Sequence, residues 1–466
     1  MAVAPRAPAT PQSMTPQPST FALDEHNLLR SVNGLAIPII AENLFQTMLG
    51  VVDLAMVGTL GAVAIAGTGS ALQIMFLVIS ALSAITVGTT VLVARFTGAG
   101  EPAQGSRAAK QSLLMGVVLA VIVTVLGHFY AHTVIAWLGV EPEVVEAGGG
   151  YLDVVAQMSL FLIVQLVCGG ALRGAGDTRT PMVVTGLVNL VNIGVAYVLI
   201  FGHFGFPAMG VVGSAWGASI ARMIGAIVMV AILASGRRKI DIRGRDGWMP
   251  DFELMKRTLK IGLPSMVEQT LMSLGMLLYS LIVIGMGTDA YAAQRITFNA
   301  LSVSFLPGLG FGMAATTMTG QSLGAGRPDI ARRSTWIAFR MAAVWMCLVG
   351  AGLFIFDRQI MELFTDDPAI IAVGAPALRV IALSQPLQAL AQVTSGSLRG
   401  AGDTRFPMYA TAVSVWLVRL PLGWVFGIPL DMGLSGVYIS NVIDAGFRAA
   451  ANFWRFQKGR WQNARV

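Results

Sequence analysis

Two carboxylates, Glu42 and Asp53, lie within one long apolar stretch near the start of the chain. Eleven residues of α-helix turn through about 1,100°, roughly 20° more than three full turns, so both carboxylates project from one face about 16 Å apart. Gln46 follows Glu42 by one turn and joins that face. A carboxylate at bilayer depth costs on the order of 2.5–3.5 kcal/mol or more, so an acid there indicates function by default. The pattern favours uptake of a proton or Na⁺ by Asp53, with a position at the outer interface as the alternative. Glu42 and Gln46 are candidates for a cavity or a gate, and a structural role for Glu42 stays open.

A second polar pair, Asn189 and Asn192, interrupts a later apolar stretch. The two residues are three apart, so they share one face of a helix. Asparagine carbonyls can ligate a hard cation or accept a hydrogen bond. A buried asparagine can equally serve only to join two helices. The residues alone leave both interpretations open.

The chain contains a tandem duplication. The segment LRGAGDTRTPM, residues 172–182, returns as LRGAGDTRFPM, residues 398–408, with ten of eleven positions identical and an offset of 226. Gly98-Ala99-Gly100 and Gly324-Ala325-Gly326 keep the same offset. One half of the protein must therefore be built like the other.

The second copy keeps only part of the polar stripe. Glu268 matches Glu42, whereas Tyr279 stands where Asp53 would be and Met272 replaces Gln46. Paired glutamates indicate a structural or gating task shared by the halves, and an unpaired aspartate indicates a task of one half. The remaining cavity candidates are the polar residues of the second half, Tyr279, Gln294 and Gln388.

Composition places these halves in a membrane. Only 12% of the 466 residues are charged and 55% are hydrophobic, against about a quarter charged in a soluble domain. The apolar residues come in blocks of about 20, the length that a helix needs to cross the hydrocarbon core. We predict an all-α polytopic membrane protein with 12 transmembrane helices, arranged as two six-helix repeats around a central cleft.

Positive charge in the loops predicts the topology, because Lys and Arg favour the cytoplasmic side. Lys and Arg gather in alternate loops, so both termini are expected on the cytoplasmic side. The membrane is expected to be the plasma (inner) membrane of the cell. The net charge of +7 follows from this asymmetry, and no nucleic-acid partner is expected. The predicted divisions are a disordered cytoplasmic tail (1–30), an N-terminal six-helix repeat (31–234), a cytoplasmic linker (235–256), a C-terminal six-helix repeat (257–455) and a cytoplasmic tail (456–466).

The glycine-rich motif is typical of a turn between two spans. Gly174 and Gly176 allow a tight turn, and Pro181 suits the first turn of the next helix. Arg173 and Arg179 are expected to lie at the lipid headgroups. No Gly-Lys-Ser/Thr phosphate loop is present, so an ion gradient rather than ATP is the expected energy source. The two cysteines lie inside apolar stretches, and we expect no metal site and no cofactor.

These features resemble those of the multidrug and toxic compound extrusion (MATE) transporters, from about residue 31 to 455. The resemblance is carried by Pro38, the VDLAMVG segment at 52–58, the Gly-Ala-Gly turns, the paired LRGAGDT motifs and Gly262-Leu263-Pro264. It implies an antiporter that exports amphipathic, often cationic organic compounds in exchange for H⁺ or Na⁺ by alternating access. It also implies that Asp53 takes up the ion, with Asn192 beside it in the branch resembling the DNA-damage-inducible (DinF-like) proteins.

The chain departs from both bacterial patterns within that family. The DinF-like pattern has an aspartate where Ala196 stands, and the NorM-type pattern has acids where Gln388 and Met272 stand. Asp53 is therefore expected to act nearly alone, which suits a proton better than Na⁺, because hard metal cations prefer several oxygen ligands. Whether the C-terminal half holds a second cation site stays open.

One alternative function has the same layout. A flippase for lipid-linked or polysaccharide precursors would need cationic residues in its cavity, and Arg295 and Arg419 lie within apolar stretches. A membrane enzyme is disfavoured because no nucleophile–base pair is visible, and a channel because duplicated halves suit a rocking motion. The expected partners are small amphipathic substrates and membrane lipids, with the protein acting as a monomer.

Overall fold

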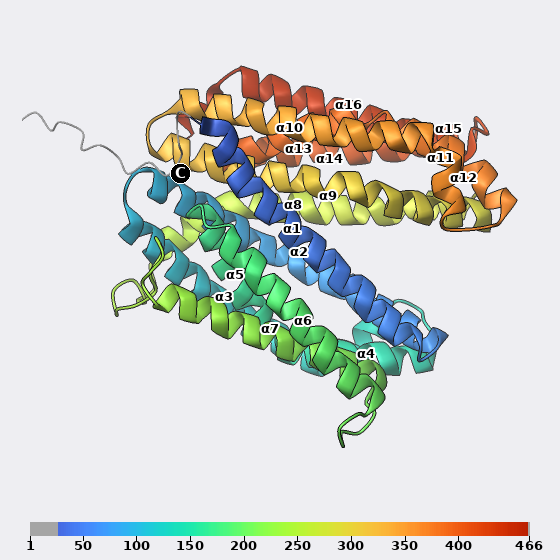
Figure 1. Ribbon diagram of the computed structural model, residues 1–466, viewed down its shortest axis with the longest axis horizontal. Coiled ribbons are helices and arrows are strands. Elements are labelled where there is room, and N and C mark those ends of the chain that lie inside the picture. The colour runs from blue at the N-terminus through green and yellow to red at the C-terminus, as the bar shows by residue number, and fades with distance from the viewer. Residues whose placement is uncertain (1–26, 465–466) are drawn as a thin grey trace, which may run out of the picture.

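The computed structural model describes residues 27–464, and throughout that range the chain consists of helices and the loops between them (Figure 1). The tail predicted at 1–30 falls mostly outside the described residues. Its last three residues, from Leu28, already belong to the first helix. Two repeats of similar helices follow, as the duplicated sequence predicts.

The described residues of the N-terminal half form seven helices. They are α1 (Leu28–Gly58), α2 (Ala62–Gly98), α3 (Pro102–Ala136), α4 (Pro142–Gln157), α5 (Ser159–Gly174), α6 (Arg179–Phe201) and α7 (Gly210–Ala234).

The C-terminal half repeats this order with more interruptions. Its elements are α8 (Phe252–Ile284), α9 (Thr288–Gly324), α10 (Pro328–Ile355), α11 (Asp357–Glu362), α12 (Pro368–Ala382), α13 (Gln385–Gly400), α14 (Arg405–Val413), the π-helix η2 (Ser414–Arg419), α15 (Leu420–Gly427), α16 (Gly433–Gln457) and the 3₁₀-helix η3 (Arg460–Asn463).

Two of the predicted spans are bent rather than straight. In the described part of the chain nine helices, counting α14 to α15 as one, are long and apolar enough to cross a membrane, and the count reaches 11 when each bent pair is one span. The pair α4 and α5 bends by 57° at Met158, and α12 and α13 bend by 50°. Pro386 lies in the first turn of α13, where its missing N–H is tolerated, so a new helix begins there. The predicted twelfth span is α16, which falls outside this count and carries Asp444 and Arg448.

The first helix of each half packs against the other half. Val32 and Ile39 of α1 lie in one core cluster with Met318 of α9 and residues of α10 and α13. At the start of α8 the backbone of Thr258 leaves no room for a Cβ on Gly88 of α2. Both halves are therefore joined through helices that reach across from the opposite repeat.

The two halves meet closely at one end of the molecule, which we call the basic end because the Arg- and Lys-rich loops lie there. Gly98 of α2 lies against the backbone of Gln321, and Gly324 of α9 lies against the backbone of Arg95, so these repeat-related glycines let the two helices touch. In Figure 1 the upper helices (α9 to α16) and the lower helices (α3 to α7) converge at this left-hand end and diverge toward the right.

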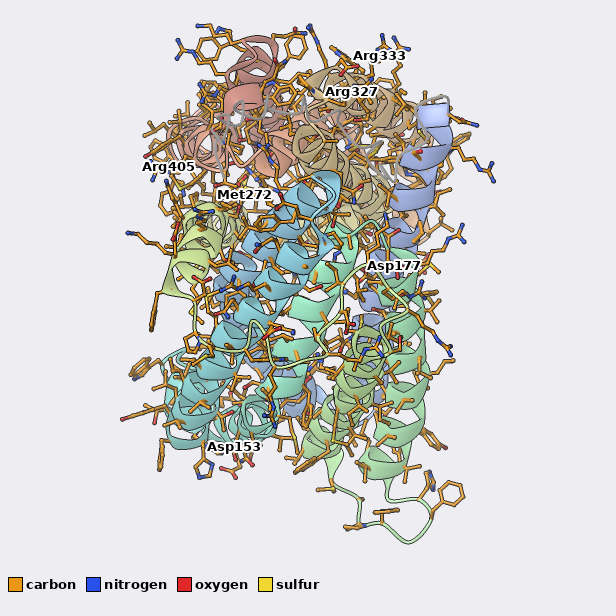
Figure 2. The ribbon with its side chains drawn as sticks, turned by 90° about the vertical axis from the view of Figure 1, so that its left-hand side faces the viewer. Asp153, Asp177, Met272, Arg327, Arg333 and Arg405 are labelled. Atoms are coloured by element: carbon orange, nitrogen blue, oxygen red, sulfur yellow. The ribbon has the colours of Figure 1, made fainter. Side chains whose placement is uncertain are left out.

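Side-chain hydrogen bonds reinforce the contact at the basic end. The Arg95 guanidinium donates to the carbonyl of Ala401 at 2.9 Å. Gln321 Nε2 donates to the carbonyl of Gly174 at 2.9 Å, and Thr317 Oγ1 to that of Arg173 at 3.2 Å. Figure 2 looks onto this end, with Asp177 in one half and Arg327, Arg333 and Arg405 in the other.

The linker after α7 is folded onto α3. The buried Lys110 ammonium donates to the carbonyls of Arg243 and Asp246 at 2.8 and 2.7 Å. Gln111 Nε2 donates to those of Gly247 and Met249, both at 2.7 Å. Beyond α16, where a tail was predicted, the chain turns back and the buried Trp461 stacks on Phe456.

Candidate functional site

A buried ion pair joins α1 to the end of α5. Arg173 Nη1 donates to Glu42 Oε1 at 2.8 Å and to Oε2 at 3.1 Å. The side chains are only 9% and 6% exposed, so water screens the pair weakly. The prediction that Arg173 lies at the headgroups is therefore wrong. A helix-end arginine can reach inward along its stem when a buried carboxylate is within range.

The second half repeats this pair. Arg399 Nη2 donates to Glu268 Oε1 at 2.7 Å, and the Thr411 hydroxyl donates to the same oxygen at 3.1 Å. Arg399 is 33% exposed, so this pair is wetter than its counterpart. Both glutamates thus fasten the first helix of their repeat to the arginine of the LRGAGDT motif.

Asp53 and Asn192 lie in direct contact. Asn192 Nδ2 donates to Asp53 Oδ1 at 2.6 Å, and the asparagine is fully buried. Arg222 on α7 exerts an electrostatic attraction on this carboxylate. An amide of α6 thus holds the carboxylate of α1, and Arg222 of α7 adds a positive charge to their surroundings.

Asn189 serves a different purpose from Asn192. Its Nδ2 donates to the Phe45 carbonyl of α1 at 2.6 Å. Asn189 thus joins α6 to α1, one helix turn before Asn192. The carbonyl oxygens of both asparagines are buried without a partner in the described structure.

Pro38 lies within α1 and Pro264 within α8. Each helix continues through its proline.

At the position of the second half that matches Asp53, the uncharged side chain of Tyr279 joins two helices. Its hydroxyl donates to the Val437 carbonyl of α16 at 2.8 Å. The Arg419 guanidinium lies over its ring at 4.2 Å from the centroid. The second half thus has, in place of a carboxylate, an aromatic ring in cation–π contact with an arginine.

The other cavity candidates are not drawn into one cluster by any contact in the described residues. Gln46 is exposed on α1, and its counterpart Met272 is labelled in Figure 2. Gln294 on α9 and Gln388 on α13 are buried, each with an Oε1 that has no partner in the described chain. They belong to neighbouring helices of the C-terminal half.

Sequence reasoning passed over Arg222 and missed one pairing. Arg222 could have been found, because it is a single charge in an otherwise apolar stretch, the same signal that singled out Asp53. Arg419 was noted only as a flippase feature. The pairing of Arg173 with Glu42 was hinted at by the duplication, since both members recur at the offset of 226 as Arg399 and Glu268.

Comparison with known proteins agrees with this geometry. The family profile named MatE matches residues 38–198 and again residues 264–425. A protein of Thermotoga maritima described as "Probable multidrug resistance protein NorM" is 33% identical over 436 residues, covering 93% of both chains. "Uncharacterized transporter YisQ" of Bacillus subtilis is 29% identical, covering 92% of this chain and 94% of its own.

Solved structures show the same fold. One described as the outward-facing conformation of a multidrug resistance MATE family transporter of the MOP superfamily superposes with a TM-score of 0.87, at 24% identity over 95% of this chain and all of that one. A MOP superfamily transporter of Pyrococcus furiosus gives 0.86 at the same identity and coverage. The two matched repeats and the full-length relatives show that this chain is a multi-pass membrane protein that belongs to the MATE family of transporters.

Proposed function

We propose that this protein is a secondary antiporter that exports amphipathic, often cationic organic compounds in exchange for H⁺ or Na⁺, as a multidrug efflux transporter. The observation that carries the proposal is the contact between Asp53 and Asn192 at 2.6 Å within a membrane-spanning bundle. Relatives described as multidrug resistance proteins of Thermotoga maritima and Yersinia enterocolitica support the substrate class.

The basic end is proposed to face the cytoplasm, with both chain ends on that side of the plasma (inner) membrane. Most of the lysines and arginines lie in its loops or in the helix ends beside them, as the positive-inside rule requires. The halves touch at that end through Gly98 and Gly324. Their helices diverge at the other end (Figure 1), which in this orientation supports an outward-facing conformation.

Coupling follows from the charge of Asp53. When the carboxylate takes up an ion from outside, its negative charge is neutralised and its attraction for a cationic compound falls. Loss of that charge also weakens the hydrogen bond from Asn192, so α1 and α6 can repack around Pro38. The compound leaves to the outside. The transporter, which still carries the ion, then closes on its outer side and releases the ion into the cytoplasm. The ion must bind one of the two states better, since only a difference in affinity can shift their populations.

A proton is the ion that the site favours. Na⁺ needs several oxygen ligands, and Ala196 offers none where the DinF-like pattern has an aspartate. Arg222 also places a positive charge near Asp53. The pairing of Asp53 with Asn192 supports a place on the DinF-like branch, and Tyr279 supports coupling through the N-terminal half alone.

The expected partners of the transporter are small amphipathic substrates and the surrounding membrane lipids. It has no nucleic-acid partner in this proposal, and a single chain is the working unit. The glutamates of the two ion pairs act as gating elements, because each fastens the first helix of its repeat at the basic end. Gln46, Gln294 and Gln388 are proposed to contribute polar surface along the transport path.

The test is active transport of a permanently cationic dye by the wild-type chain in sealed vesicles. We expect dye movement when a proton or sodium gradient is imposed, and none when the gradients are collapsed. Transport that proceeds equally without any gradient would contradict antiport. Failure to move any dye, together with accumulation of lipid-linked precursors in cells that lack the protein, would favour the flippase.

A further inference from the structure

Arg419 is a buried arginine whose charge no acidic side chain balances. It lies in the membrane-spanning segment formed by α14, η2 and α15, and its residue is 7% exposed. Its Nε is buried without a hydrogen-bond partner, and no carboxylate of the described residues lies within ion-pair distance. Its guanidinium lies over the ring of Tyr279, 4.2 Å from the centroid. An intramembrane charge in this condition is costly and indicates a site.

The nearest acid is already committed. Asp444 on α16 accepts from Arg448 at 2.9 Å and also accepts a short hydrogen bond from Ser414. Both Arg419 and Asp444 act electrostatically on Tyr279, so the three side chains form one neighbourhood. Asp444 is therefore paired with Arg448, and the positive charge of Arg419 has no ion-pair partner in the described residues.

Arg419 holds the place in the C-terminal half that Asn192 holds in the N-terminal half. Asn192 contacts Asp53, and Arg419 contacts Tyr279, the residue at Asp53's repeat position. The offset of 226 would match Asn192 to Val418, one residue too early. The π-helix Ser414–Arg419 accounts for the slip, and the second MatE match is correspondingly one residue longer than the first. Such π-bulges are frequent at functional sites.

We propose that Arg419, resting on Tyr279, is an anion-binding subsite that takes the carboxylate of an amphipathic substrate. A guanidinium presents a planar fork that binds both oxygens of a carboxylate. With one face covered by the Tyr279 ring, the nitrogens at its edges remain for a ligand. The duplicated site has thus divided its tasks: Asp53 takes the coupling ion, and Arg419 selects substrates that carry an acidic group beside their cationic one.

This inference rests on the proposed export function and adds a substrate class to it. A substrate with both charges would place its carboxylate at Arg419, and its cationic part would extend away from the guanidinium. A purely cationic compound would lack the first contact. The protein should therefore prefer zwitterionic amphiphiles over their esters.

The experiment compares a rhodamine that carries a free carboxylate with its methyl ester. Both bind to the purified full-length chain in lipid nanodiscs at neutral pH, and fluorescence anisotropy gives the two Kd values. The quantity of interest is the ratio of ester Kd to acid Kd. We expect a ratio of about tenfold or more in the wild type, from a charge-assisted hydrogen bond. In Arg419→Gln the ratio should fall to near one, and in Arg419→Lys it should lie between the two.

The matched control is Arg340→Gln, which removes an exposed arginine of α10 in the same half. Its ratio should equal the wild-type ratio. An unchanged ratio in Arg419→Gln would overturn the proposal. So would equal affinity of the wild type for the acid and the ester, and that result needs no variant to fold. If the wild type exports the ester under a gradient yet shows no preference, only the subsite fails; if it moves neither dye, the transport proposal fails first.

Discussion

Arg173 donates to both carboxylate oxygens of Glu42, and 226 residues later Arg399 donates to one carboxylate oxygen of Glu268. The carbonyl of Arg173 also accepts the Thr317 hydroxyl from the opposite half. The ion pair of the N-terminal half therefore lies next to the surface where the halves close. A residue that fastens α1 within its own repeat thus also borders the contact that alternating access must break.

Removal of one partner of the buried pair should destabilise the protein strongly. In Glu42→Gln the Arg173 guanidinium stays buried without a counter-ion, and such a loss costs about 3–5 kcal/mol. Glu268→Gln should cost clearly less, because Arg399 is 33% exposed and water can solvate it. Chemical unfolding of the detergent-purified variants, followed by tryptophan fluorescence, measures both.

The control for this series is Glu362→Gln, whose partner Arg358 is 74% exposed. A surface pair of this kind is worth about 0–1 kcal/mol, so little change is expected. An equal loss of unfolding free energy in the Glu42 and Glu268 variants would contradict the finding that the Glu42–Arg173 pair is the less solvated of the two.

Asn192 and Asn189 should give different phenotypes although they are one helix turn apart. Asn192→Ala removes the donor that stabilises the charged carboxylate of Asp53. A hydrogen bond to a charged group contributes about 1.5–3 kcal/mol, so half-maximal transport should shift by about one unit toward higher pH if the coupling ion is a proton. The pH dependence of dye uptake in vesicles measures the shift.

Asn189→Ala serves as the comparison, because it removes a bond to the Phe45 carbonyl and leaves Asp53 with its partner. It should lower stability by about 1 kcal/mol and leave the pH midpoint where it is. A midpoint that moves equally in both variants would show that Asn192 acts only as helix packing.

A side chain added at the basic end should wedge the halves apart. A Cβ on Gly324 would meet the backbone of Arg95 and Ala99, which cannot rotate away. Gly324→Ala should therefore raise the population that is open at the basic end. Spin labels at Ala103→Cys and Arg333→Cys, in a Cys347→Ser background, report that opening as a longer distance.

Gly352→Ala is the matched control, because nothing lies within 4 Å of its Cβ and it occupies a helix in the same half. Its distance distribution should match that of the glycine parent. If Gly324→Ala keeps the short distance as well, the glycine contact does not hold the halves closed.

Much of the fold could be predicted from the sequence, because its signals are repetitive. Apolar blocks and the LRGAGDT motif show the membrane bundle and its duplication. The bends at Met158 and before Pro386 could not be seen in composition, since both segments remain apolar through the break. The packing of α1 on the opposite half was also hidden, because small and apolar residues suit lipid and protein neighbours equally.

The candidate site was only half visible. A lone aspartate in an apolar helix stands out, so Asp53 was found, and its contact with Asn192 came from a resemblance rather than from geometry. Arg173 was misplaced because its side chain is long enough to reach either the headgroups or Glu42. The contact of Arg419 with Tyr279 depends on a one-residue slip in a π-helix, and a constant offset conceals that slip.

The most direct test of the account is gradient-driven export of a cationic dye by Asp53→Asn beside the wild type, in vesicles of equal protein content. Asp289→Asn, which alters an exposed carboxylate at the start of α9, is the control. The account predicts transport by the wild type and the control under a proton gradient, its loss in Asp53→Asn, and weaker binding of the cationic dye by that variant. Transport by Asp53→Asn at the wild-type rate, under either a proton or a sodium gradient, would contradict it.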